Sequence, residues 1–287
     1  MMEKESKANV NHNYLNRFFT KKYLIDKIYS EEFVSDLFLQ ELEKNYKLLN
    51  SEYRNEFFYK SILFNKYIIG KYSLKTSTAL SEIVIDNSKA DFIVLNRSNG
   101  IVFEIKTELD NFDRLIYQLN DYYKVFSMVN VVASEKNYYP VYKLLKETNP
   151  NVGIIVLTKN KRLSVRKTPI RDDMALNHEA LFKLLRKNEY EKIILYKFGF
   201  IPDVKPVHFF RTLLELFKQI NIIEAQTLVF KELNKREKSG TIEIIKYLPE
   251  SIRWLVYSGK YNEQTLHFIC EKLNLRGDMN VLPNNKR

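Results

Sequence analysis

The chain has 287 residues, of which 45% are hydrophobic, with 19 tyrosines, 19 phenylalanines and 1 cysteine. This composition supports a packed core and excludes a disordered chain, an intramolecular disulfide framework and a zinc site built from cysteines. The net charge of +11 is spread along the chain. It favours a polyanionic partner, although an ordinary lysine-rich composition gives the same charge.

Several classes of protein are disfavoured by what the sequence lacks. No stretch approaches the roughly 18 consecutive apolar residues that cross a membrane. The start, from Met1 to Asn13, is polar and charged, unlike a secretion signal. We therefore expect a cytoplasmic protein with no membrane partner. The four histidines have no metal-ligand spacing, and no glycine-rich phosphate loop is present, which argues against a nucleotide-driven enzyme.

The N-terminal part of the chain predicts helices. A basic amphipathic segment extends over residues 16–28. Ser30 is a suitable cap for a helix that ends near Leu49, and its first turn carries two glutamates. Ser51 begins a further helix, which Gly70 ends as a C-cap residue.

Two glutamates in this region are candidates for a site. Glu56 lies at the edge of the aromatic stripe of the helix that begins at Ser51, so it is either solvated or directed into a site. Residues 76–85 predict an extended segment that carries Glu82. A strand there would pair beside the next hairpin and bring Glu82 close to it; the alternative is a charge on an edge strand.

Two apolar runs, 90–95 and 101–106, flank the turn-forming residues 96–100 and predict a β-hairpin. With the turn centred on residues 97 and 98, Asp91 falls opposite Glu104. Side chains paired in this way have Cβ atoms about 4.5–5.5 Å apart.

Glu104 and Lys106 share one face of the second predicted strand, because side chains alternate along a strand. Two facing carboxylates repel each other, and a hard divalent cation relieves that repulsion. Two acids and a lysine around one metal form a set suited to phosphodiester hydrolysis. The alternative is a surface hairpin whose charges are solvated.

A helix over residues 111–128 follows this hairpin. Asp110 is a good N-cap residue and Asp113 stands in the first turn, where an acid is favourable. Gln118 and Tyr122 are four residues apart and project from one face. They either reach the site of Glu104 and Lys106, or Gln118 is solvated and Tyr122 lies at the rim of the core.

The next elements predict a parallel crossover. Residues 129–134 form a buried strand after the helix, so strand, helix and strand occur in the order that gives a right-handed parallel unit. A helix over 139–148, a buried strand over 153–158 and an edge strand over 163–167 complete this part of the chain.

From about residue 170 the pattern changes to helices, predicted over 178–187, 189–198, 207–219, 223–235, 241–248, 251–258 and 264–273. Their basic faces carry Arg211, Lys218, Lys231, Lys235, Arg236 and Lys238. The segments 207–219 and 223–235 form either a helix-turn-helix or an ordinary pair of packed helices, and we favour the second interpretation.

An ordered set of residues resembles the PD-(D/E)xK phosphodiesterase superfamily, which has the restriction-endonuclease-like fold. The matching positions are Asp91, then Glu104-Ile105-Lys106, then Gln118 and Tyr122, which are similar to the Q-x-x-x-Y element of RecB- and Cas4-like nucleases. The residue before the aspartate is Ala90, where the superfamily's motif has a proline.

Residues 54–134 also resemble a narrower, largely uncharacterised bacterial family. Its pattern consists of R-N-E, an acid before the first core strand, K-A-D, E-I-K-x-x-x-D and Q-x-x-x-Y-x-K-V-F. Here these elements are Arg54-Asn55-Glu56, Glu82, Lys89-Ala90-Asp91, the segment 104–110 and the segment 118–126.

The resemblance implies a role for each of these residues. Asp91, Glu104 and the backbone carbonyl of Ile105 would hold Mg²⁺ or Mn²⁺, and Glu82 and Glu56 would complete the metal shell. Lys106 would position the attacking water and neutralise charge on the phosphate. Gln118 and Tyr122 would orient Lys106 or the nucleic-acid backbone.

We therefore expect an α/β protein with a restriction-endonuclease-like mixed sheet flanked by helices. Residues 1–49 form an N-terminal helical extension, 50–168 the nuclease-like domain and 169–287 a basic helical domain. The expected function is metal-dependent cleavage of DNA, by a homodimer if both strands are cut. The alternative is a non-catalytic module of a phage, mobile element or defence system that binds nucleic acid or another protein.

Overall fold

The computed structural model describes residues 11–236 and 242–275. Contacts between Cα atoms divide the chain into two compact units. The first unit comprises residues 1–65 and 241–287, and the second comprises residues 66–240. Each unit is described by itself.

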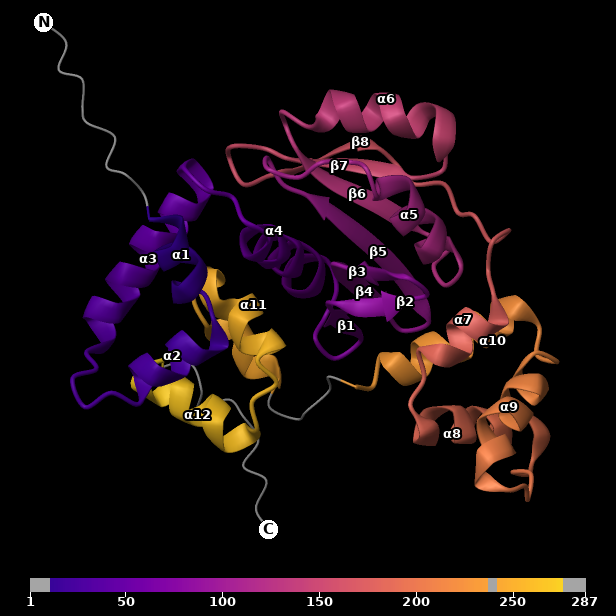
Figure 1. The fold of residues 1–287 in the computed structure, drawn as a ribbon. Helices are drawn as coiled ribbons and strands as arrows, with labels where there is room; N and C mark the ends of the chain where they lie inside the picture. Colours follow the sequence, from indigo (N-terminus) through magenta and orange to yellow (C-terminus); the bar gives the residue numbers. More distant parts are fainter. Residues whose placement is uncertain (1–10, 237–241, 276–287) are drawn as a thin grey trace, which may run out of the picture. The chain divides into compact units, whose positions relative to one another are not determined.

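The first unit consists of helices drawn from both ends of the chain. They are α1 (His12–Phe18), α2 (Lys21–Ile28), α3 (Ser35–Ser51), α4 (Glu56–Leu63), the 3₁₀ helix η2 (Ile242–Tyr247), α11 (Glu250–Ser258) and α12 (Glu263–Lys272). Helices α3, α4 and α11 pack against one another (Figure 1). Directly after α4, the ring of Phe64 lies against those of Trp254 and Tyr257 in α11.

The second unit is built on a six-stranded sheet in the order β1-β4-β5-β6-β7-β8 (Figure 1). The strands are β1 (Ser77–Leu80), β4 (Phe92–Asn96), β5 (Asn99–Lys106), β6 (Val129–Ser134), β7 (Gly153–Leu157) and β8 (Leu163–Lys167). Strands β5, β6 and β7 are parallel, and the remaining pairs are antiparallel. Strands β2 (Ile83–Ile85) and β3 (Ser88–Ala90) form a separate two-stranded sheet. The expected mixed α/β fold, with helices before and after the sheet, is confirmed.

The β4–β5 hairpin has the expected register. Asn96 pairs with Asn99 across a turn made by Arg97 and Ser98, and Phe92 pairs with Phe103 at the far end. Arg97 has a φ of 56°, the left-handed conformation that such tight turns require.

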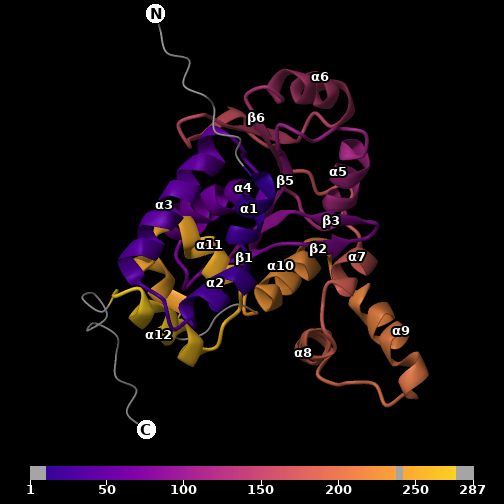
Figure 2. The same cartoon turned by 60° about the vertical axis from the view of Figure 1, so that its left-hand side comes forward.

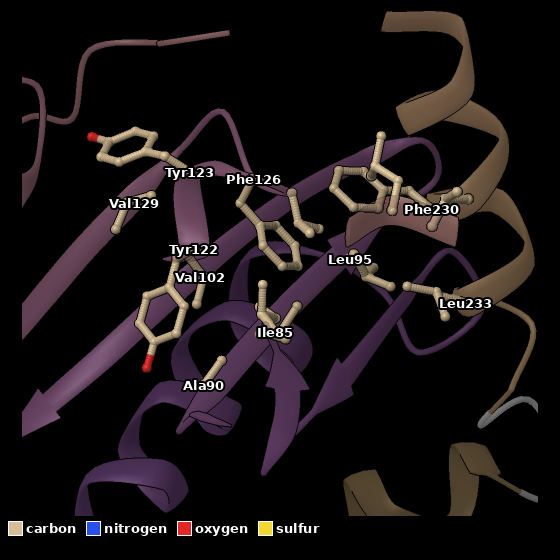
Figure 3. Close-up of a cluster of buried hydrophobic side chains, with 14 of the residues drawn as sticks. Ile85, Ala90, Leu95, Val102, Tyr122, Tyr123, Phe126, Val129, Phe230 and Leu233 are labelled. Atoms are coloured by element: carbon tan, nitrogen blue, oxygen red, sulfur yellow. The ribbon is translucent and has the colours of Figure 1, made fainter. Parts of the chain in front are cut away.

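Six α-helices accompany this sheet: α5 (Leu115–Tyr123), α6 (Tyr138–Thr148), α7 (His178–Lys183), α8 (Lys187–Phe198), α9 (Pro206–Phe217) and α10 (Ile222–Leu233). A π-helix, η1 (Phe64–Lys71), follows α4 and contains the boundary between the two units. One face of the sheet, α5, α6 and the helices α7 to α10 share a single apolar core, part of which Figure 3 shows.

Helix α10 is fixed to the tip of the β4–β5 hairpin. The ring of Phe230 stacks on that of Phe126 with centroids 5.0 Å apart, beside Gly100. The Asn234 side chain donates hydrogen bonds to the backbone carbonyls of Thr76 and Arg97. Because α10 buries its apolar face in this way, its contacts with the sheet favour ordinary helix packing over a helix-turn-helix. Figure 2 shows α7 beside α10, and α9 contacts α7 and α8.

The compact units differ from the three expected segments. Helices α7 to α10 belong with the sheet because their apolar side chains enter its core, whereas η2, α11 and α12 belong with the N-terminal helices. Within residues 11–236 and 242–275, none of the helices is long and apolar enough to cross a membrane.

Several expected helix ends are wrong. Ser30 does not cap α3, which begins at Ser35 after Val34. The helix after Lys106 begins at Leu115, not at residue 111, and Asp110 does not cap it. Instead, Asp110 Oδ2 accepts hydrogen bonds from the backbone N–H and the hydroxyl of Thr107, both at 2.7 Å. Helix α4 begins at Glu56 with Asn55 as its N-cap, and Gly70 lies within η1 and is no C-cap.

Candidate active site

Strand β5 places Glu104 and Lys106 on the sheet face that α5 covers. Alternation along the strand sends Phe103 and Ile105 to the other face, where the Phe103 ring lies 4.9 Å from that of Tyr67. Glu104 is 1% exposed and the Lys106 side chain is 11% exposed. Two ionisable groups are thus buried side by side, which a protein tolerates only when they are paired and hydrogen-bonded.

Hydrogen bonds join these two residues to α5. Lys106 Nζ donates to Glu104 Oε1 at 2.9 Å and to Gln118 Oε1 at 3.0 Å. The Tyr122 hydroxyl donates to Glu104 Oε2 at 2.6 Å and lies 3.0 Å from the carbonyl oxygen of Lys89. Gln118 and Tyr122 are one helical turn apart, so one face of α5 holds both ends of the ion pair. The structure thus brings together four of the residues named from the sequence.

Tyr122 is a permanent proton donor in this network. Burial raises the pKa of its hydroxyl well above the ordinary value of 10.0, and the negative charges of Glu104 and Asp91 raise it further. The hydroxyl therefore stays protonated across the whole neutral range and can keep donating to the carboxylate.

Asp91 precedes β4 by one residue, and the β4–β5 register, extended by one pair, sets it opposite Glu104. Its Oδ2 accepts a hydrogen bond of 2.7 Å from the backbone N–H of Ile105. The carboxylate of Asp91 is therefore tied to the strand segment between Glu104 and Lys106. The carboxylates of two neighbouring strand ends and the lysine lie in one region of the sheet.

The local structure at Glu82 differs from the expected strand, but its carboxylate does lie close to that of Asp91, with an oxygen of each within 4.8 Å of the other. The extended segment 76–85 is broken, because β1 ends at Leu80 and Glu82 has a left-handed φ of 57° in the link to β2. Glu82 is exposed and forms an ion pair with Lys89 of β3. Non-glycine residues rarely adopt this conformation, and sequence periodicity does not reveal it.

Glu56 belongs to the first unit. It begins α4 directly after the capping residue Asn55, and its carboxylate forms an ion pair with the buried Lys60. Its participation in a site with Asp91 and Glu104 stays a prediction.

Sequence reasoning missed the residues that hold the chain beyond Lys106. The Asn137 side chain donates to the carbonyl oxygen of Thr107, and Asp110 binds the same residue from the other side. These contacts fix the exit of β5 next to the lysine. The spacing between Glu104 and Asp110 is the signal for this contact, but the residue type of Asp110 favours a helix cap.

The donor set of this region is chemically suited to a hard divalent cation. Asp91, Glu104 and the carbonyl of Ile105 offer only oxygen atoms, which Mg²⁺ and Mn²⁺ prefer. Each Glu104 oxygen accepts one hydrogen bond within the protein. A carboxylate oxygen has a second acceptor site, so both atoms keep the capacity for a further ligand.

The fold and this cluster define an α/β protein with a buried glutamate–lysine pair beside a second carboxylate, held by a glutamine and a tyrosine of the following helix. By sequence, the chain belongs to the family described as Bacteriophage P4 protein cII, which matches residues 49–254. It is therefore a bacteriophage-related protein. No curated protein and no solved structure matches the chain.

Proposed function

We propose that this protein is a metal-dependent phosphodiesterase that cleaves DNA in the cytoplasm. The main support for this proposal is that Asp91, Glu104 and Lys106 lie together at neighbouring strand ends, with Lys106 Nζ 2.9 Å from Glu104 Oε1. Two carboxylates and a lysine are the components that hydrolysis of a phosphodiester requires.

The proposal gives each residue a role. Asp91, Glu104 and the Ile105 carbonyl would hold Mg²⁺ or Mn²⁺, with Glu82 completing its shell. The bound ion would supply stabilisation of the negative charge that develops on the phosphate. Lys106 has three N–H donors and uses two of them on Glu104 and Gln118, so one remains for the attacking water or a phosphate oxygen.

Gln118 and Tyr122 act by positioning. Gln118 fixes the ammonium group of Lys106, and Tyr122 fixes the carboxylate of Glu104. Because both come from one face of α5, the helix sets the geometry of the acid and the lysine together. If both strands of DNA are cut, two such sites are needed, and a homodimer would supply them.

The charge of the chain supports a nucleic-acid partner in part. The net charge is +11, but several basic side chains of the C-terminal helices are used within the protein. Lys218 pairs with Glu215, Lys235 pairs with Glu232, and Arg236 forms a buried ion pair with Glu189. Lys238 lies outside the described residues. DNA contacts are therefore expected from other basic side chains, such as the exposed Arg211 and Lys231.

One observation favours a second candidate function, a module that binds nucleic acid or another protein without turnover. Glu104 is 1% exposed, and both of its oxygens are already hydrogen-bonded inside the protein. Such a network can serve the stability of the sheet alone.

The test compares wild type with Asp91→Asn on supercoiled plasmid and on single-stranded DNA, with Mg²⁺, with Mn²⁺ and with EDTA. Asp203→Asn is the matched control, because Asp203 is an exposed aspartate in the loop between α8 and α9. The proposal expects cleavage by wild type and by Asp203→Asn that needs a metal, and a loss of at least 100-fold in Asp91→Asn with an unchanged urea midpoint.

Calorimetric titration of Mn²⁺ separates the two candidates. Saturable Mn²⁺ binding that Asp91→Asn abolishes supports the catalytic site. Salt-sensitive DNA binding by a folded protein, without Mn²⁺ binding and without product, overturns the nuclease proposal and supports the binding module. Cleavage that survives Asp91→Asn overturns the assignment of the site.

A further inference from the structure

The second unit contains a cavity of about 460 Å³ that the proposed nuclease site does not use. It lies between α5, the residues that follow α6 and the segment before α7. Its lining includes Asn120, Tyr123, Asn149, Asn151, Met174 and Asn177. The volume falls within the range of about 300–1,000 Å³ that is usual for small-molecule pockets.

This cavity is separate from the Glu104 site because adjacent residues of α5 point in different directions. The Tyr122 hydroxyl binds Glu104, whereas Tyr123 lines the cavity. Figure 3 shows the two rings diverging from the helix, with their hydroxyl oxygens far from each other.

Two buried polar atoms of the lining residues have no hydrogen-bond partner among the described residues. They are the hydroxyl of Tyr123 and Oδ1 of Asn149, whose residues are 6% and 9% exposed. Leaving such a group unsatisfied costs about 1–3 kcal/mol. A molecule in the cavity that donates to Asn149 and bonds to Tyr123 would remove both costs.

The side-chain amide of Asn149 uses its nitrogen for a hydrogen bond within the protein. Its Nδ2 donates to Asn120 Oδ1 at 3.0 Å, so its carbonyl oxygen is the end left for a ligand. This oxygen accepts hydrogen bonds only, so it requires an N–H or O–H donor. The Tyr123 hydroxyl can donate as well as accept.

The two charged side chains of the lining have partners within the protein: Lys124 is neutralised by opposite charges, whereas Asp172 keeps its negative charge and is hydrogen-bonded. Lys124 forms ion pairs with Asp86 and Asp121. Asp172 accepts hydrogen bonds from the Asn151 side chain at 2.8 Å and from the Met174 backbone at 3.0 Å. The cavity therefore presents amides, a hydroxyl, the Asp172 carboxylate and the apolar surfaces of Pro150 and Met174, which suit a flat ligand that carries N–H donors on its edge.

We propose that this cavity binds a nucleobase with an exocyclic amino group, and that adenine is the best match. The amino group donates to Asn149 Oδ1, and the Tyr123 hydroxyl donates to a ring nitrogen. Asparagine side chains complement the amino and ring-nitrogen edge of adenine in DNA through both ends of one amide; here Asn149 Oδ1 would supply one of these contacts and the Tyr123 hydroxyl the other. The proposal stands independently of the nuclease proposal, since it concerns other residues and a binding event without chemistry.

The test is calorimetric titration of the full chain with adenosine, inosine, uridine and ribose. Inosine has a keto group where adenosine has its amino group and a proton on N1, so it removes the proposed donor and turns one ring-nitrogen acceptor into a donor. We expect saturable binding of adenosine, at least tenfold weaker binding of inosine and uridine, and no binding of ribose. Equal affinity for adenosine and inosine, or binding of ribose alone, overturns the proposal.

Two variants locate the binding. Tyr123→Phe removes the unpartnered hydroxyl, so the thermal midpoint of the free protein should stay the same or rise. The same change should weaken the binding of adenosine at least tenfold. Asn120→Ala, at an exposed position, removes the hydrogen bond that holds the Asn149 amide, so it should also weaken the binding of adenosine. Tyr139→Phe, on the exposed side of α6, is the matched control. Absence of nucleoside binding by wild type overturns the proposal, and a lower thermal midpoint in Tyr123→Phe would then mean that water already satisfies the hydroxyl.

Discussion

The hydroxyl of Tyr122 lies 2.6 Å from Oε2 of Glu104, while Lys106 holds Oε1 of the same carboxylate at 2.9 Å. Each oxygen of a fully buried acid is thus bound by a different element, one by the next helix and one by its own strand. This arrangement fixes the carboxylate in one orientation. It also makes the stability of the sheet depend on the residues that the nuclease proposal needs, and measurements can separate the two roles.

Tyr122→Phe should lower the free energy of unfolding by about 1–3 kcal/mol, since the buried carboxylate loses a charge-assisted hydrogen bond. Urea denaturation followed by circular dichroism measures the change. Tyr139→Phe, which removes an equal hydroxyl from an exposed ring, should stay within about 0.5 kcal/mol of wild type. A Tyr122→Phe variant as stable as wild type would mean that the hydroxyl contributes nothing to holding Glu104.

A double-mutant cycle tests the buried ion pair. Glu104→Gln leaves the Lys106 ammonium buried without its counter-charge and should cost about 3–5 kcal/mol. Lys106→Met leaves the carboxylate in the same state and should cost a similar amount. The double variant removes both charges, so its loss should be clearly smaller than the sum of the two single losses. Additive losses in urea titrations would show that the two side chains do not interact.

Buried tyrosines predict a loss of stability at alkaline pH. Burial raises the pKa of Tyr46, Tyr122 and Tyr123 above the ordinary 10.0. Because the pKa is raised in the folded state, the contribution of these hydroxyls to the free energy of unfolding is complete below pH 10.0. It is lost as the pH rises toward the folded-state pKa values. Tyrosinate absorbance should therefore appear together with unfolding above pH 10.0 for these residues. Ionisation of all tyrosines before the loss of circular dichroism would contradict this expectation.

The register of the central hairpin could be predicted because its determinants are local. Alternation of apolar residues and a turn at Arg97 and Ser98 are enough to set Asp91 opposite Glu104. The spacing of Gln118 and Tyr122 on a helix is equally local, so their shared face followed from periodicity. Periodicity does not show whether that face is directed to the site or to solvent. In the structure, Gln118 and Tyr122 are hydrogen-bonded to Lys106 and Glu104.

The errors arose where tertiary contacts compete with local preferences. Asp110 is a good helix cap by residue type, but Thr107 offers it two donors, so the helix starts later. Glu82 lies in a sequence typical of a strand, yet the chain turns there to begin the β2–β3 hairpin. The C-terminal helices read as a separate domain because nothing in their sequence indicates that Phe230 packs against Phe126 of the sheet's core.

Cys270, the only cysteine of the chain, reports on the first unit. It is 1% exposed on α12, and burial raises the pKa of its thiol to about 11. Since the thiolate is the reactive form, labelling by an aromatic disulfide reagent at neutral pH should need local opening. We expect labelling of the native protein at least 100-fold slower than of the urea-unfolded chain. Equal rates would mean that α12 is not packed in solution.

The docking of α10 on the β4–β5 hairpin can be tested at Gly100. A Cβ at this position would lie 2.7 Å from Phe230 Cε2 and 2.9 Å from Phe126 Cε1, so Gly100→Ala should cost about 1–3 kcal/mol through overpacking. The comparison is Gly199→Ala, where the described residues leave open space for a methyl group. Only the left-handed φ of 78° disfavours a side chain there, so this change should lower the free energy of unfolding by about 1 kcal/mol.

A second substitution identifies the cause of the loss at Gly100. Phe230→Leu removes the ring that the new methyl group would meet, so the double variant Gly100→Ala with Phe230→Leu should be more stable than the sum of the two single changes predicts. The same Phe230→Leu change should leave the cost of Gly199→Ala unaltered, because Gly199 has no neighbour within 4 Å among the described residues. Additive losses at Gly100 and Phe230 would mean that the two residues are not in contact, and α10 would then pack elsewhere than on the hairpin.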